Sequence, residues 1–112
     1  MKLVGRIDKA RVTEGALVRV PYPPYDVCVT RRGGRFFAME DACNHAGASL
    51  ADGVIIRDCI SCPMHGYLFS LETGELVSPK GLCEDQRAFV VEEEGDDLVI
   101  WDPFEVVVLG GT

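Results

Sequence analysis

Both histidines of the chain, and two of its five cysteines, lie in two short segments that could bind a metal. The first segment reads Cys43-x-His45 and the second reads Cys62-x-x-His65. Each supplies one thiolate and one imidazole. Because both histidines of the chain stand beside a cysteine in this way, the pattern predicts a metal centre with four protein ligands.

Two kinds of metal centre use two cysteines and two histidines. Structural zinc sites usually pair like ligands, as C-x₂₋₄-C followed by H-x₃₋₅-H. Here each pair is mixed, and only Asn44 separates the ligands of the first pair. A [2Fe–2S] cluster can instead take two thiolates on one iron and two imidazoles on the other. Two similar loops, each giving one ligand to each iron, satisfy that requirement, so the spacing favours the cluster, with a zinc-stabilised interaction module as the alternative.

The two segments, residues 43–47 (CNHAG) and 62–66 (CPMHG), resemble the two boxes of Rieske iron–sulfur proteins. The resemblance covers roughly residues 17–101. It implies one Rieske [2Fe–2S] cluster per chain, and the ligands it implies are Cys43, His45, Cys62 and His65. Glycines follow the two histidines closely, at Gly47 and Gly66, where the absence of a Cβ lets the backbone approach an inorganic group.

The resemblance also bears on the surroundings of the cluster. In the family a loop that contains a proline covers the cluster, and Pro79 resembles that proline. The alternative is that residues around Pro79 form an ordinary surface turn. High-potential members carry two additional cysteines, one with each box, that form a disulfide with each other; the matching positions here are Ala48 and Met64. They also place serine and tyrosine hydroxyls against the cluster, where this chain has Tyr67 and Phe69. Fewer hydrogen bonds to sulfur predict a low potential, near or below about −100 mV.

Composition indicates one small globular domain spanning residues 1–112. Hydrophobic residues make up 47% and charged residues 26% of the chain. We expect a soluble, cytoplasmic protein without a membrane partner, because neither an apolar run of about 20 residues nor a signal peptide is visible. The net charge of −7 disfavours nucleic acid as a partner and is compatible with steering toward a basic redox partner.

Short apolar runs alternate with turn residues throughout, which is typical of an all-β protein. We predict a small antiparallel β-sandwich with a two-loop cluster-binding subdomain at about residues 42–70. Prolines make residues 21–25 a loop or a sheet edge. The apolar tail at 104–109 could be an edge strand or an interface. The predicted strands are 2–7, 16–20, 26–31, 35–40, 54–56, 59–61, 67–70, 75–77, 86–93 and 97–101.

Three cysteines are left outside the predicted ligand set. Cys28 lies in a strand-like run, where a buried thiol acts as a small hydrophobic residue. Cys59 forms a C-x-x-C with Cys62, but Cys62 is better explained by its spacing to His65. Cys83 has no predicted role.

A soluble, low-potential domain of this kind resembles Rieske-type ferredoxins. The resemblance implies a one-electron carrier between a flavin-dependent reductase and the terminal oxygenase of a ring-hydroxylating dioxygenase system. It implies a carrier and not an enzyme, since no histidine is left for the mononuclear iron of an oxygenase. The small Rieske-like subunit of an NAD(P)H nitrite reductase is the alternative.

Overall fold

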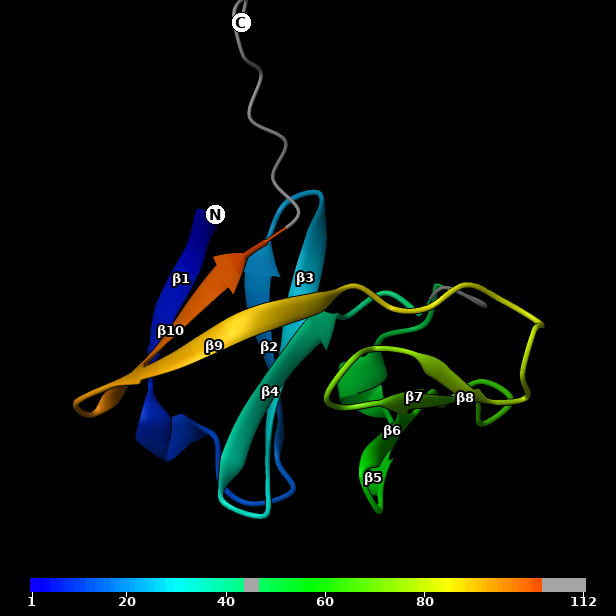
Figure 1. The fold of residues 1–112 in the computed structure, drawn as a ribbon. Helices are drawn as coiled ribbons and strands as arrows, with labels where there is room; N and C mark the ends of the chain where they lie inside the picture. Colours follow the sequence, from blue (N-terminus) through cyan, green and yellow to red (C-terminus); the bar gives the residue numbers. More distant parts are fainter. Residues whose placement is uncertain (44–46, 104–112) are drawn as a thin grey trace, which may run out of the picture.

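The computed structural model describes residues 1–43 and 47–103, and within them the chain forms two antiparallel sheets (Figure 1). The predicted all-β architecture is thereby confirmed. Two short 3-10 turns, η1 (Lys9–Arg11) and η2 (Leu50–Asp52), interrupt the strands. The strands are β1 (Lys2–Asp8), β2 (Leu17–Tyr22), β3 (Tyr25–Arg32), β4 (Arg35–Glu40), β5 (Val54–Ile56), β6 (Cys59–Ser61), β7 (Leu68–Ser70), β8 (Leu76–Ser78), β9 (Ala88–Glu94) and β10 (Asp97–Asp102).

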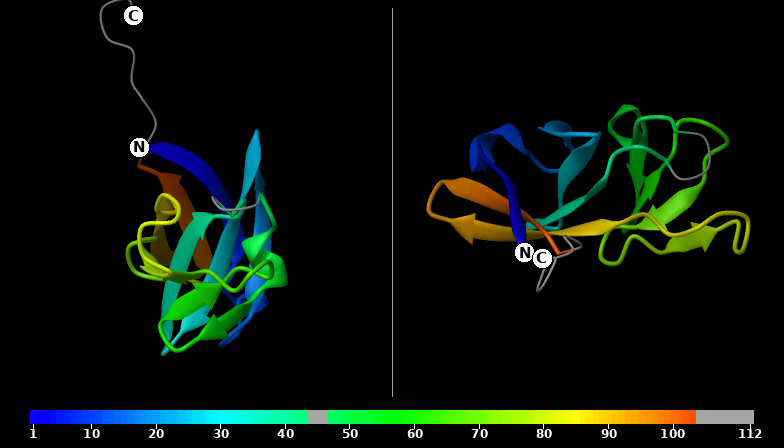
Figure 2. Two further views of the ribbon diagram at one scale, coloured as in Figure 1. Left: turned by 90° about the vertical axis from the view of Figure 1, so that its right-hand side faces the viewer. Right: turned by 90° about the horizontal axis from the view of Figure 1, so that it is seen from above.

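The large sheet has the order β1-β10-β9-β4-β3-β2 and curls so that its two edges approach each other (Figures 1 and 2). A Cβ built on Gly5 of β1 would lie 3.8 Å from the Val20 side chain of β2. Pro21 and Tyr22 pair with Asp26 and Tyr25 at this edge, as the proline-rich sequence predicted. Proline is tolerated at such a position because an edge strand need not donate every N–H.

The small sheet, β5-β6-β7-β8, stands beside the large one (Figure 1). Its first two strands have the predicted bounds, 54–56 and 59–61. It also includes β8, which lies beyond residue 70, the predicted end of the cluster-binding subdomain. The division of the chain into domains stays a prediction. The tail at 104–109 lies outside the described residues.

Strands β3 and β4 separate two hydrophobic cores, because alternate residues of a strand point to opposite faces. Val27 and Val29 pack inside the curl of the large sheet, together with Ala38. Their neighbours Cys28 and Met39 point the other way, into a core shared with the small sheet. That second core also contains Cys43 and Cys62, so the predicted ligand cysteines are held between the two sheets.

Cys28 is buried, as predicted, and this burial makes stability depend on pH. Burial raises its pKa from 9.0 to about 12 in the folded chain. Between these values the unfolded state binds fewer protons than the folded state, so stability falls as pH rises. We expect a Cys28→Ala variant to lose this contribution to the pH dependence of the unfolding free energy, which is at most about 1.4 kcal/mol per pH unit. Urea unfolding at pH 8 to 10.5 measures it, and identical pH profiles for the two proteins would contradict the assignment.

No helix among the described residues is long and apolar enough to cross a membrane.

Candidate metal centre

Cys43 and Cys62 meet at the base of two loops, although 18 residues lie between them in the sequence. The first loop follows β4 and the second follows β6. The exposed fractions of Cys43 and Cys62 are only 3% and 1%, and neither thiol forms a disulfide. The pKa of Cys62 is raised to about 11, mainly by burial and next by a hydrogen bond with the Cys43 thiol, against a smaller lowering by the Met64 backbone N–H. The two predicted thiolate ligands are therefore neighbours in a nearly dry environment.

Backbone hydrogen bonds close both loops next to the cysteines. In the first loop Cys43 N donates to Ala48 O at 2.7 Å and Gly47 N donates to Cys43 O at 2.7 Å. In the second, Cys62 N donates to Tyr67 O at 2.8 Å. Gly47 has φ +70° and Gly66 has φ +66°, a region that only glycine adopts without cost. This backbone requirement is an additional reason for the two glycines, beyond the close approach predicted from sequence.

His65 is placed differently from the two cysteines. His65 lies at the surface, at the tip of the second loop, and its φ of +67° is unusual for a residue with a side chain. Strained backbone of this kind is concentrated at functional sites. His45 lies outside the described residues. In the described part of the chain, no three His, Cys, Asp or Glu side chains gather closely enough to hold one metal ion.

The donor set nevertheless fits the predicted cluster. Thiols must lose their protons to bind iron, and burial of Cys62 opposes that loss, so the pair needs a nearby cation to be stable as thiolates. In a Rieske cluster each iron takes only two protein ligands, both thiolates or both imidazoles. A buried cysteine pair and a separate surface histidine match this division better than they match one tetrahedral zinc.

Asp41 anchors the residues that follow the first loop, a role that the sequence patterns did not predict. Its exposed fraction is 5%. One carboxylate oxygen accepts from Ala51 N at 2.9 Å, and the other accepts from Ser49 Oγ at 2.6 Å and from Arg19 Nε at 3.4 Å. Arg19 Nη2 also donates to Ser49 Oγ at 2.7 Å. The carboxylate thus fixes the residues that follow the loop against strand β2.

The loop after β8 brings Cys83 to the site. Cys83 is half-buried and packs against the core that contains Cys43 and Cys62. Burial and the neighbouring Cys43 both raise its pKa. Pro79, in the same loop, is half-buried. Its covering of the cluster stays a prediction.

Tyr67 and Phe69 occupy the positions compared above with the hydroxyl donors of high-potential members. Phe69 is fully buried in the core that contains both ligand cysteines. Tyr67 is half-buried and packs against the same core. A buried phenyl ring cannot donate a hydrogen bond to sulfur, which agrees with the predicted low potential.

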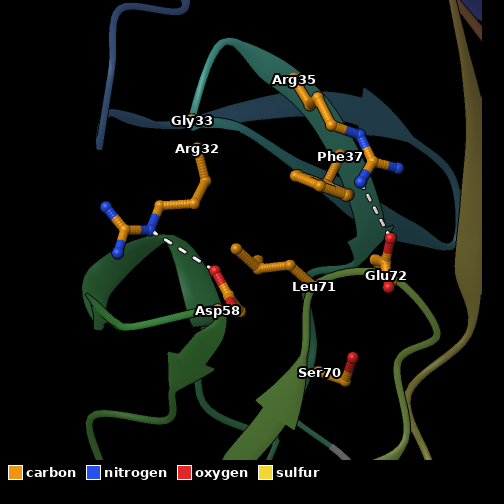
Figure 3. A pocket seen from close by; sticks show the side chains of 8 residues that line it. All are labelled: Arg32, Gly33, Arg35, Phe37, Asp58, Ser70, Leu71 and Glu72. Carbon is orange, nitrogen blue, oxygen red and sulfur yellow. Dashed lines mark hydrogen bonds and ion pairs between the residues drawn. The ribbon is translucent and has the colours of Figure 1, made fainter.

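A cleft of about 520 Å³ lies between the two sheets on the side shown in Figure 3. Two ion pairs cross it, from Arg35 Nη1 to Glu72 Oε1 at 2.9 Å and from Arg32 Nε to Asp58 Oδ1 at 3.8 Å. Arg32 Nε also donates to the backbone oxygen of Arg57 at 2.8 Å. These side chains are exposed, so the pairs add little stability. They connect the turn between β3 and β4 to the small sheet.

The family model for the Rieske [2Fe–2S] domain matches residues 3–82. The chain belongs to the Rieske [2Fe–2S] domain family. This membership confirms the resemblance drawn from the two boxes, and with it the Rieske cluster as the cofactor.

Two Rieske relatives show which members the chain is similar to. It is 35% identical over 86 residues to the ferredoxin component of biphenyl 2,3-dioxygenase from Rhodococcus jostii, covering 77% of this chain and 79% of the relative. It is 33% identical over 96 residues to the ferredoxin subunit of 3-phenylpropionate/cinnamic acid dioxygenase from Escherichia coli K12, covering 81% and 85%.

Solved structures agree with these relatives. The ferredoxin of carbazole 1,9a-dioxygenase from Nocardioides aromaticivorans superimposes with a TM-score of 0.80 at 24% identity, over 90% of this chain and 98% of that one. At this identity the likeness shows the Rieske fold. A chain from the complex of reduced oxygenase and oxidised ferredoxin in carbazole 1,9a-dioxygenase matches with a TM-score of 0.75 at 31% identity, over 83% and 95%.

Proposed function

We propose that the protein is a low-potential Rieske ferredoxin, which carries single electrons from a flavin-dependent reductase to the terminal oxygenase of a ring-hydroxylating dioxygenase system. The observation that carries the proposal is the buried pair Cys43 and Cys62 beneath the surface residue His65, in a chain whose relatives are ferredoxin components of dioxygenases. These relatives favour the ferredoxin over the nitrite reductase subunit.

Cys43 and Cys62 would hold one iron of the cluster, and His45 and His65 would hold the other. A cluster bound there would supply one-electron redox chemistry. The core around the cysteines excludes water from the inner side, because Leu50, Ile60 and Phe69 are almost fully buried there. His65 lies at the surface, where a partner can approach closely. The chain thereby gives the site one open side.

The relatives and this open side support the proposed partners. A solved complex of oxygenase and ferredoxin contains a chain similar to this one, which supports an oxygenase as electron acceptor. Met64 and Leu82, on the second loop and the loop after β8, are 47% and 66% exposed. An oxygenase that docks over these two loops would cover both side chains. The three cysteines outside the proposed ligand set, Cys28, Cys59 and Cys83, form no disulfide, which is the state expected in a reducing compartment and supports a cytoplasmic location.

A redox titration monitored by EPR tests this function. We expect a Rieske-type signal in the reduced protein and a potential near or below about −100 mV that is constant around neutral pH. Fewer hydrogen bonds to the cluster sulfurs are the reason for the low value. We also expect reduction by NADH in the presence of the flavin reductase of a ring-hydroxylating dioxygenase system.

Three results would contradict the proposal. A clearly positive potential that already falls with pH near neutrality would indicate quinol chemistry. A colourless protein with bound zinc would support the interaction module, because zinc has no redox chemistry. Recovery of the protein in a complex with a large sirohaem protein would favour the nitrite reductase subunit.

A further inference from the structure

Gln86 joins three segments that are distant in sequence. Its exposed fraction is 3%. Its side-chain nitrogen donates two hydrogen bonds, to Glu40 O at 3.0 Å and to Ala42 O at 2.8 Å. Ala42 directly precedes Cys43, so these bonds hold the chain at the entrance to the first ligand loop.

The backbone of Gln86 makes a second connection. Gln86 N donates to Gly74 O at 2.8 Å, in the turn between β7 and β8. Gly74 has φ +77°, and a Cβ at this position would collide with the backbone oxygen of Gln86. The two segments are therefore packed backbone against backbone.

The β7–β8 turn is connected to the second ligand loop through strands β7 and β6. Gly74 N donates to Ser70 O at 2.8 Å, and Ser70 of β7 pairs with Cys59 of β6. Strand β6 ends at Ser61, immediately before Cys62. A continuous set of hydrogen bonds and strand pairings thus connects Ala42, through the side chain and backbone of Gln86, to the strand that ends just before Cys62.

We infer that Gln86 is a positioning residue that fixes the first ligand loop against the β7–β8 turn, and thereby sets how Cys43 and Cys62 face each other. The inference rests on the proposed function, since those cysteines are its proposed ligands. An amide is suited to this task because its NH₂ group has two donors, which here serve two carbonyl oxygens. The strand predicted at 86–93 begins only at Ala88, because the backbone N–H of residue 86 donates to Gly74 in the β7–β8 turn instead of to a neighbouring strand.

A Gln86→Met variant tests the inference, because methionine has a similar length but no N–H donor. We expect amide hydrogen exchange at Cys43, Gly47 and Leu50 to accelerate by about tenfold or more, the factor that follows from losing one or two buried hydrogen bonds. Amides of β1 and β10 should keep their wild-type rates. In the loaded protein we expect altered EPR g-values and faster cluster loss to an iron chelator.

Leu98→Ala is the control, because Leu98 is fully buried in the other core, inside the large sheet. It should accelerate exchange in β1 and β10 and leave the g-values unchanged. If Gln86→Met behaves like this control, or leaves both the loop exchange and the EPR spectrum unchanged, the inference is wrong. Should Gln86→Met not fold, Gln86→Asn, which keeps the donors on a shorter side chain, should show a weaker version of the same pattern.

Hydrogen exchange separates this inference from the proposed function. A wild-type protein without a Rieske-type signal would refute the function. The loop-specific exchange of the Gln86 variants would still decide whether Gln86 positions the first loop.

Discussion

Replacement of Cys62 by alanine is expected to abolish the visible absorption and the EPR signal of the protein. Cys62 is 1% exposed and shares a hydrogen bond with Cys43, so its removal would take away one of the two proposed thiolate ligands. The loss of bound iron should exceed the roughly 10–100-fold loss of metal affinity that follows from changing an outer-shell partner. Iron and sulfide analysis of the purified variant, together with its absorption spectrum, measures the effect.

Cys59→Ala is the matched control, since Cys59 is the other cysteine of the C-x-x-C and is half-buried in β6. The proposed ligand set predicts that this variant keeps its cluster and its potential. If Cys59→Ala lost iron as completely as Cys62→Ala, or if the C-x-x-C bound zinc, the assignment of Cys62 to the cluster would be wrong.

Asp41→Ala is expected to lower the free energy of unfolding by about 2–4 kcal/mol, because buried hydrogen bonds to a charged group contribute about 1.5–3 kcal/mol each. The substitution removes the acceptor of the Ala51 N–H and of the Ser49 hydroxyl. Arg19 adds less, since it is 43% exposed and water screens its charge. Chemical denaturation of the variant and the wild type measures the difference.

Asp58→Ala provides the comparison for the same residue type. Asp58 is 93% exposed, and its ion pair with Arg32 spans 3.8 Å. Substitution of such a surface residue should change stability by less than about 0.5 kcal/mol. Equal effects of the two substitutions would show that Asp41 does not support the first loop.

Local sequence patterns were sufficient to predict most strands. The turn between β3 and β4 contains Gly33 and Gly34, both with positive φ, so the hairpin could be read from two glycines between apolar runs. The bounds of β5 and β6 follow from three-residue runs between turn residues. Cys28 could be assigned to the interior because it lies in a strand-like apolar run, between Val27 and Val29.

The supports of the site could not be predicted in this way. Asp41 and Gln86 are polar residues next to loops, which in sequence are typical of exposed positions. Their roles arise from contacts with distant segments, such as the bond from Gln86 to Ala42, 44 residues away. Cys83 packs against the core that contains Cys43 for the same reason, because the loop after β8 lies next to the site. Single-sequence patterns carry no information about such pairings.

The two buried faces of β3 and β4 determine which length changes the chain can tolerate during evolution. Adding or removing one residue within β4 would exchange Ala38 and Met39 between the two cores, because the side-chain period of a strand is two. A two-residue change would preserve the alternation. We therefore expect natural variation in length to be confined to the turns of this protein, with β3 and β4 constant in length.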